Sequence, residues 1–364
     1  MGSISKRHKL SEEQYEDRIS NLPNSLIAQI LSCLPTKYAV STSVISTRWK
    51  ELWTSITSFD FDDELLLCPQ NKSTDPAMQR SFTSFVHRVL LHHVSCVQRF
   101  RLKCSQKVDA SLVNRWIADI ILRNVRELDL YLSVRMHSVM LPEEFFTCRT
   151  LVVLKLNAYG DMNAVPSSAS LPSLRILHLS GIKFVNDDSI NWFLLGCPVL
   201  EELSMVACVG ENVSVINIVA PMLTSLSMVN SLFRSREQED EFERKIVLDT
   251  PALLYLTIED SGEDGSYLVE NSHHLVRADI DLYTEGMLDI SKVLTDLLKG
   301  LSDVQFLKLG FTFTMGVYLR DIQLPKFLNM TYLELGDFHG EWKLLLVLLK
   351  NSPHLETLIV KDVS

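Results

Sequence analysis

The sequence predicts an α/β protein in which a small module of three helices precedes a curved solenoid of short parallel strands. Two observations predict this fold. Between residues 24 and 56, apolar residues recur at three- and four-residue spacing, which is typical of amphipathic helices. From residue 97 onward, the pattern apolar-x-x-apolar-x-apolar recurs eleven times. We therefore expect a curved parallel sheet on the inner side of the solenoid, with helices and loops on the outer side.

The first helix of the module is predicted from Leu26 to Leu34, because its apolar residues fall on one helical face. We expect Asn24 or Ser25 to cap its start, since both side chains can accept a backbone hydrogen bond there. Pro35 should end it.

Two further helices should complete the module, which we place at residues 17–61. Thr36 can cap the second, and Ser46 or Thr47 the third, which carries Trp49 and Ile56 on a common side. Three helices of this length are too small to enclose so much apolar surface. A face left open on such a module predicts a binding partner.

Residues 62–96 are predicted to be a linker and the first helix of the solenoid, and residues 97–364 an arc of about eleven units. The first and last units start at Val97 and Leu355, so ten steps of about 26 residues separate them, a period typical of leucine-rich repeats. Alternate apolar residues bury one face of each short strand. Between two strands, Asp188 should cap a returning helix that Gly196 and Pro198 end.

Composition indicates a globular protein poorly suited to binding nucleic acid or anionic membranes. Of 364 residues, 46% are hydrophobic and 22% charged, and the net charge is −10. Non-specific binding to nucleic acid or anionic lipid needs a basic surface. No apolar run approaches the roughly 18 residues of a membrane span. We expect neither nucleic acid nor a membrane as a partner.

The cysteines and the first residues favour the cytoplasm, the nucleus or both. The seven cysteines are irregularly spaced and form no C-x-x-C pair, which is typical of reduced thiols rather than disulfides or zinc ligands. Residues 1–16 lack an apolar signal core, so they are predicted to be a flexible tail. No nucleotide-binding, hydrolase or metalloprotease motif is present. We expect a non-catalytic protein without metal or cofactor.

The stretch from Asp17 to Phe61 resembles an F-box, and the whole chain resembles the plant F-box proteins that carry leucine-rich repeats, in particular the F-box/FBD/LRR group. The resemblance rests on the Leu22-Pro23 start, the LPTK turn and the Arg48-Trp49 end, in that order, and on repeat phrases such as CPVLEELSM and SPHLETLIV. In that group the FBD region would begin near Ser364, so we expect it to be absent or cut off.

The resemblance implies a substrate-recognition subunit of an SCF-type, cullin-RING ubiquitin ligase. In the family, the F-box binds a Skp-type adaptor, and through it the cullin, while the remainder selects a protein substrate. Carried over to this sequence, the expected adaptor contacts are Leu22, Pro23, Ile27, Ile30, Leu31, Leu34, Pro35, Val44, Ser46, Arg48, Trp49 and Trp53.

A substrate is expected on the inner curve of the arc, because the third and fifth residues of each unit point away from the core. Arg99, Arg101 and Lys103 predict a small basic edge, and Phe306, Tyr332 and Ile359 an exposed apolar stripe. The candidate substrate contacts are Arg99, Arg101, Ser204, Ser227, Tyr255, Thr257, Phe306, Lys308, Tyr332 and Glu334.

Two alternatives remain open. The arc can be a receptor for a small signalling molecule, which would need a pocket gathered from several units. The chain can also be an interaction scaffold of leucine-rich repeats outside any ligase. Co-purification with the adaptor and cullin would separate the ligase from the scaffold, and thermal stabilisation by a panel of hormones would identify the receptor.

Overall fold

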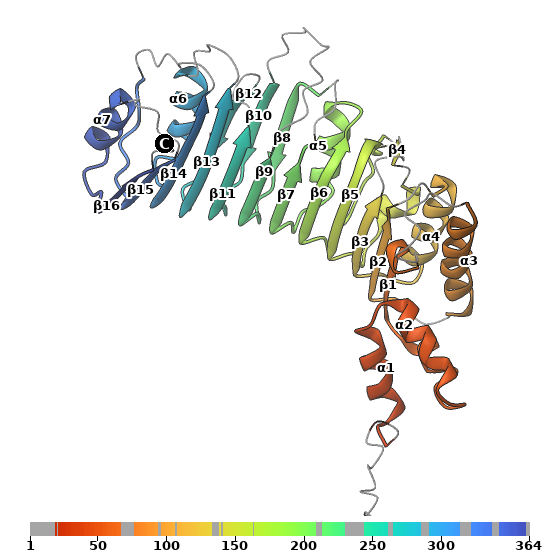
Figure 1. Ribbon diagram of the computed structural model, residues 1–364. Helices are drawn as coiled ribbons and strands as arrows, with labels where there is room; N and C mark the ends of the chain where they lie inside the picture. Colours follow the sequence, from red (N-terminus) through yellow and green to blue (C-terminus); the bar gives the residue numbers. More distant parts are fainter. Residues whose placement is uncertain are drawn as a thin grey trace, which may run out of the picture.

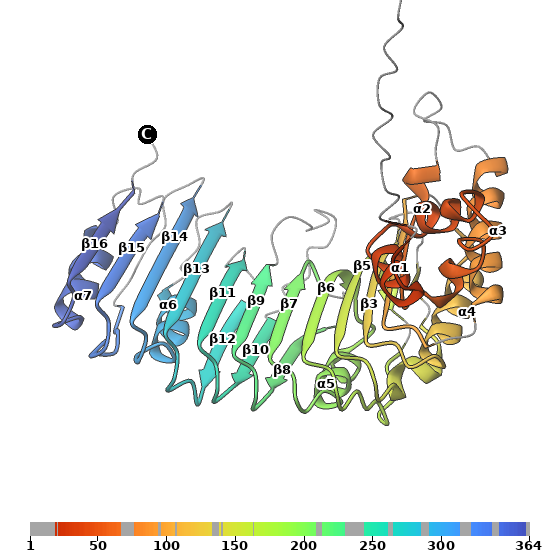
Figure 2. The same ribbon diagram turned by 90° about the horizontal axis from the view of Figure 1, so that it is seen from below.

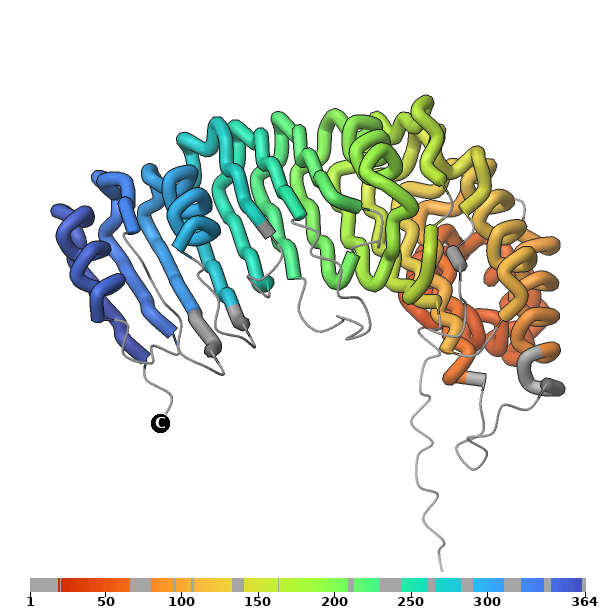
Figure 3. Tube along the Cα trace, turned by 90° about the horizontal axis from the view of Figure 1, so that it is seen from above, coloured from red at the N-terminus to blue at the C-terminus, as the bar shows by residue number. Residues whose placement is uncertain are grey.

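The computed structural model describes residues 19, 21–66, 76–93, 96–105, 108–132, 138–139, 141–162, 164–208, 213–229, 244–260, 265–284, 291–313, 322–336 and 342–361. The predicted tail, residues 1–16, lies outside these residues. The chain forms an arc with the helical module at one end and the last strand at the other (Figures 1 and 3).

The helical module contains α1 (Asn24–Ser32) and α2 (Thr36–Ser41), followed by the 3-10 helices η1 (Thr42–Val44) and η2 (Leu52–Ser55). The predicted caps differ from the structure. Pro23 and Pro35 occupy the N-cap positions of α1 and α2, and neither helix has a side-chain cap. Proline has no side-chain oxygen that could accept a hydrogen bond from the first N–H groups of the helix.

The third predicted helix forms turns followed by η2 rather than one α-helix. Trp49 and Ile56 face inward as their spacing predicted, and both are buried. The side chain of Arg48, within these turns, reaches back to the start of α1. Contacts within the module therefore determine the backbone conformation of this segment, although its apolar spacing favours an α-helix.

The arc is built on a sheet of 13 strands within the described residues, and every pairing in it is parallel. Each of the eleven predicted units carries one strand, which begins two residues after the unit starts. In spatial order the strands are β1 (Ser58–Asp62), β2 (Arg99–Cys104), β3 (Glu127–Leu132), β5 (Val153–Met162), β6 (Ile176–Lys183), β7 (Glu202–Val206), β9 (Ser225–Val229), β11 (Tyr255–Asp260), β13 (Arg277–Thr284), β14 (Phe306–Phe313), β15 (Tyr332–Gly336) and β16 (Thr357–Val360), and β4 (Ser138–Val139) pairs with β5.

The sheet begins ahead of the predicted arc. Strand β1 follows the helical module directly and pairs with β2, so the module continues into the sheet without a free linker. Phe59 and Phe61 of β1 are buried, and their rings stack with centroids 5.7 Å apart.

Helices and a second sheet cover the outer side (Figure 2). The helical elements after the module are η3 (Asp63–Leu66), α3 (Pro76–His92), α4 (Ala110–Ile121), η4 (Glu143–Thr147), α5 (Asp187–Leu195), α6 (Ser291–Lys299) and α7 (Trp342–Asn351). Between α5 and α6 lies a parallel three-stranded sheet, which was not predicted, of β8 (Val215–Val219), β10 (Arg244–Asp249) and β12 (Gly265–Glu270).

The predicted cap of α5 was wrong by two residues. Asn186, not Asp188, is the N-cap, and its side chain accepts a hydrogen bond from the Ser189 N–H at 2.9 Å. Asp187 instead accepts from the backbone N–H groups of Ser214 and Val215, at 2.7 and 3.1 Å. These contacts tie α5 to the edge of the outer sheet. Among the described residues, no helix is long and apolar enough to span a membrane.

Candidate functional site

Apolar side chains remain exposed on the helical module. On α1, Ile27 and Leu31 point inward and are buried, whereas Ile30 is 49% exposed on the opposite side. Val44, after α2, is 88% exposed. We call the six large apolar residues exposed on α1, on α2 and on the short segments that follow each of them the open apolar set: Leu26, Ile30, Leu34, Tyr38, Val44 and Ile45.

The twelve predicted adaptor contacts divide by exposure. Three are buried and pack within the chain, namely Ile27, Leu31 and Trp49. These three side chains fill the core of the module, and their contact with an adaptor stays a prediction. The half-buried contacts are Leu22, Pro35 and Trp53, and the exposed ones are Pro23, Ile30, Leu34, Val44, Ser46 and Arg48.

Three members of the open apolar set, Leu26, Tyr38 and Ile45, were not among the predicted contacts. The helical spacing of Leu26 with Ile30 could have identified it, since residues four apart lie on one face of a helix. Tyr38 carried no signal in the sequence, because its place at the surface depends on how α2 packs against α1.

Arg48 was expected to bond a partner, but its guanidinium is directed toward its own chain. It donates to the side-chain oxygen of Asn24, at 2.9 Å from Nε and 2.7 Å from Nη2, and also to the Leu22 carbonyl. Arg48 therefore holds the chain at the entry to α1 and orients the helix.

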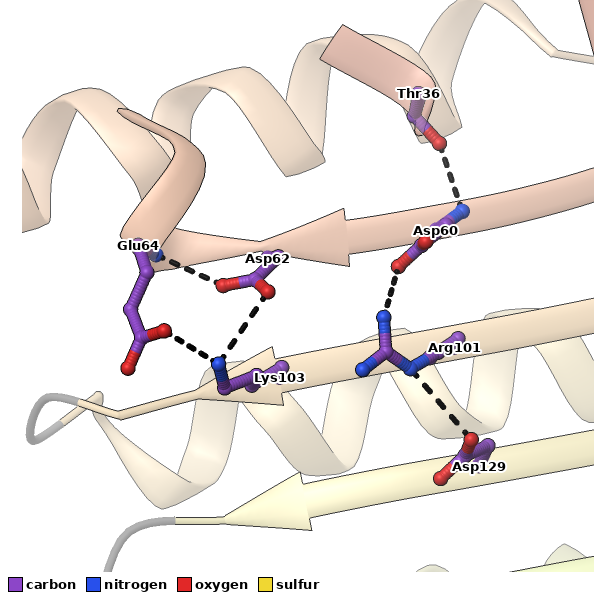
Figure 4. A network of polar contacts seen from close by, with 7 residues as sticks. All are labelled: Thr36, Asp60, Asp62, Glu64, Arg101, Lys103 and Asp129. Carbon is purple, nitrogen blue, oxygen red and sulfur yellow. Dashed lines mark hydrogen bonds and ion pairs between the residues drawn. The ribbon is translucent and has the colours of Figure 1, made fainter. Parts of the chain in front are cut away.

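Polar contacts fix the module against the arc (Figure 4). The Asp60 N–H donates to Thr36 Oγ1 at 2.9 Å, and the Thr57 N–H donates to Ser32 Oγ at 3.3 Å. Lys37 Nζ donates to the Leu65 carbonyl at 2.5 Å. Because these bonds join both helices to β1 and η3, the arc holds the open apolar set in one orientation.

His93 lies buried at the same junction. Its Nε2 is 2.7 Å from the Ile56 carbonyl oxygen, and its ring meets Phe59 edge-on with centroids 4.7 Å apart. Burial lowers the pKa of His93, and the nearby Arg123 adds to the effect. The imidazole is therefore neutral near pH 7, with Nε2 protonated so that it can donate to the carbonyl.

The predicted basic edge is neutralised by carboxylates (Figure 4). Arg101 lies 2.9 Å from Asp60 and 3.6 Å from Asp129, on the strands to either side. Lys103 Nζ lies 2.5 Å from Glu64 and 3.4 Å from Asp62, and the hydrogen bond from Lys103 lowers the pKa of Glu64.

The remaining cation of that edge, Arg99, lies 3.6 Å from Glu127. The three cations thus form a ladder of ion pairs across β1, β2 and β3. They do not make the positive surface that a phosphate-bearing ligand or cofactor would need.

The other half of the inner face carries aromatic side chains. Tyr255 is 51% exposed and Phe306 39% exposed, and the Phe306 ring lies 5.8 Å from that of Tyr332. The Tyr332 hydroxyl donates to Glu334 at 3.0 Å, which raises the pKa of Tyr332, and Lys361 lies 2.7 Å from the same carboxylate.

The other predicted substrate contacts on this half, Ser204, Ser227, Thr257 and Lys308, are half-buried on the same face, as is Ile359. The sheet therefore brings the predicted substrate contacts from Ser204 onward together on one half of the inner face. Arg99 and Arg101 lie in ion pairs on the other half.

Two thiols of the arc, those of Cys197 and Cys208, are buried and poorly suited to nucleophilic chemistry. Burial raises the pKa of both Cys197 and Cys208 to about 12, so neither is a thiolate near neutral pH. Cys33 and Cys96 are exposed. Among the described residues, no group of three or more His, Cys, Asp or Glu side chains is arranged to hold a metal ion.

Comparisons with known proteins match both parts of the chain. The family model of the F-box domain matches residues 19–61, and the model described as "FBD-associated F-box protein At5g56370, LRR repeats" matches residues 113–272. In Arabidopsis thaliana, F-box/LRR-repeat protein At3g59200 is 35% identical, over 95% of this chain and 69% of that protein. F-box/LRR-repeat protein At4g14103 is 34% identical, over 94% of this chain and 91% of the relative. F-box/FBD/LRR-repeat protein At4g26340 is 31% identical, over 95% of this chain and 77% of that relative.

Proposed function

The chain belongs to the F-box/LRR-repeat protein family, and from this premise we propose that it is the substrate receptor of an SCF-type ubiquitin ligase. In this proposal the helical module binds a Skp-type adaptor, and through it a cullin, while the arc binds a protein to be ubiquitinated. The protein would act in the cytoplasm, the nucleus or both.

The observation that carries the proposal is the open apolar set. Six large apolar side chains face solvent on a module whose own core is already filled by Ile27, Leu31 and Trp49. Fully burying an exposed leucine or isoleucine stabilises a complex by about 1.5–3 kcal/mol, so half-exposed residues would contribute about half as much each. For the six residues together this gain is comparable with the cost of association, so the set would supply a large part of the free energy that binding needs.

The proposed mechanism needs no catalytic residue in this chain. Holding a substrate lysine near an activated ubiquitin raises its effective concentration, which accelerates transfer without an acid or base from the receptor. For this role the orientation of the arc matters. The bonds from Thr36, Ser32 and Lys37 into β1 and η3 supply it, because they leave little freedom between the adaptor surface and the substrate surface.

Co-purification with adaptor and cullin tests the proposal. The full chain is co-expressed with a Skp-type adaptor and a cullin, then compared with the double variant Ile30→Ser, Val44→Ser. We expect the variant to lose most of the adaptor and cullin while it keeps its thermal unfolding temperature.

Leu122→Ser is the matched control, since Leu122 is 73% exposed but lies on the arc at the end of α4. Failure of the unchanged chain to retain the adaptor would refute the ligase role. Equal retention by the double variant would refute the assignment of the surface.

A further inference from the structure

Three segments that are distant in the sequence meet at the boundary between the helical module and the arc. They are the exit of the module at Ile56, the chain just after α3 at His93, and the turn after α4 at Arg123. Helices α3 and α4 lie beside the first strands of the sheet and next to the module (Figures 1 and 2). Side chains from two of these segments bond the backbone of another, so the contacts lead from the arc to the module.

Arg123 fixes the end of α3. Its guanidinium donates to the His93 carbonyl at 2.7 Å from Nη1 and to the Leu90 carbonyl at 3.0 Å from Nη2. The last carbonyl groups of a helix have no partner inside it, and the helix dipole favours a cation near them. The Arg123 carbonyl also accepts from the Val97 N–H at 3.2 Å. One residue of the arc thus holds both the end of α3 and the chain that follows it.

His93 connects the end of α3 to the module. Its Nε2 donates to the Ile56 carbonyl at 2.7 Å, and its side chain is buried. Thr57, the next residue after Ile56, donates its N–H to Ser32 Oγ at the end of α1. The path of contacts that starts at Arg123 therefore ends on α1, the helix that carries part of the open apolar set.

The arc is long, so a small change of angle at this boundary moves its far end over a large distance. Within the described part of the chain, the path from β1 to β16 includes twelve strands, which at about 4.8 Å per spacing makes roughly 53 Å. At that length, a rotation of about 10° would displace the last strand by about 9 Å. Transfer by proximity is sensitive to such a displacement, because effective concentration falls when two reacting groups are not held together.

Resting on the proposed function, we propose that Arg123 is a positioning residue of the ligase. Through the end of α3 and His93, it fixes the angle between the surface that binds the adaptor and the surface that binds the substrate. Its guanidinium is engaged by two carbonyl oxygens of its own chain, so it contributes to neither binding surface. Without these two bonds, the end of α3 loosens and the module samples a wider range of angles.

Pulsed electron paramagnetic resonance tests this role by measuring distances between the module and the arc in the full chain. Spin labels are attached to Cys33, which is exposed in the module, and to Leu195→Cys, since Leu195 is 62% exposed on α5. Cys68 and Cys96 are replaced by serine in every sample. We expect Arg123→Ala to widen the distribution of distances at least about twofold, because it removes bonds that hold the boundary.

The matched control is Arg126→Ala, because Arg126 is exposed just before β3, three residues further along the chain. Its distribution of distances should equal that of the unchanged chain. Arg123→Lys keeps a cation at the end of α3 but loses the planar fork that bonds two carbonyl groups, so its distribution should be intermediate in width. This second variant decides the test if Arg123→Ala does not fold.

A purely stabilising role of Arg123 would lower the unfolding temperature and leave the distances in folded molecules unchanged, and that result would overturn the proposal. Equal widening in Arg126→Ala would also overturn it. Adaptor retention is measured on the same variants without labels and should equal that of the unchanged chain. If the unchanged chain retains no adaptor, the ligase role fails, whereas the distance measurement still shows whether Arg123 fixes the angle.

Discussion

The helical module and the arc are both rich in apolar residues, but they bury them differently. In the arc, each strand places its alternate apolar residues in a shared core, and Leu130 and its counterparts on neighbouring strands are completely buried. The module buries one side of α1 and leaves the other exposed. A repeat gains its core from neighbours in the same chain, whereas the module has a neighbour on one side only. The exposed apolar residues of the module are therefore where we propose that the adaptor binds.

The largest expected effect is on the core of the arc. Leu130→Ala should reduce the free energy of unfolding by about 2–5 kcal/mol, because it leaves a cavity in a packed interior. Ile30→Ala in the module should change it by less than about 1 kcal/mol, since Ile30 faces solvent. Thermal and denaturant unfolding of both variants measure the difference. Equal losses of free energy would mean that Ile30 is buried as completely as Leu130.

The next effect concerns adaptor affinity, which should depend on substitutions in the module and not on substitutions in the arc. Ile30→Ala combined with Val44→Ala should weaken binding of a Skp-type adaptor by about 10- to 100-fold, which corresponds to about 1.4–2.8 kcal/mol. Calorimetric titration measures it. Removing exposed leucine from the arc, as in Leu122→Ala, should leave the affinity unchanged. A comparable loss from Leu122→Ala would show that the two surfaces are not distinct in function.

The repeats could be predicted because each strand rests on a short local pattern. Every unit needs only alternate apolar residues and an entry turn, so each of the eleven predicted units carries a strand. The outer sheet was missed although VINIV, residues 215–219, alternates as a buried strand does, because helices are the usual return between such repeats. The sequence predicted a full third α-helix in the module where the structure has turns and η2. Apolar spacing gives no information on the bonds from Arg48 to Asn24 and Leu22 that form in the folded module.

The candidate surfaces were predictable only in part. Apolar spacing located the module and predicted that part of its apolar surface is exposed, but it could not separate Trp49, which is buried, from Val44, which is not. On the inner face, register is a property of the folded sheet. Only the folded sheet shows that Arg101 meets Asp60 and Asp129, or that Glu259 meets Asp281.

A smaller effect is expected at the joint between the two regions. Arg101→Ala should reduce the free energy of unfolding by about 1 kcal/mol or less, because its partly exposed pairs are screened by solvent. The variant should also speed hydrogen exchange in β1 relative to β9. Arg175→Ala is the control, since its pair with Glu201 is more exposed and lies away from the joint. No difference between the two variants would argue against a role of the ladder in fixing the module.

The smallest effect is the pH dependence that His93 contributes. Its folded-state pKa is lowered, so the unfolded chain binds the proton more readily. Stability from this residue is therefore full above the unfolded value near pH 6.5 and falls as the pH drops below it. His93→Gln keeps a donor for the Ile56 carbonyl and should flatten the decline between pH 7 and pH 5.5. An unchanged slope in chemical unfolding would assign the pH dependence to other groups.

Protection of Cys33 by the adaptor tests the central claim most directly. Cys33 is exposed between Ile30 and Leu34 of the open apolar set, and Cys96 is exposed just before β2 on the arc. Alkylation of both thiols is followed by mass spectrometry in the free chain and with saturating Skp-type adaptor. The account predicts that the adaptor slows alkylation of Cys33 and leaves Cys96 unchanged. Bound adaptor with Cys33 reacting at its free rate would contradict the account.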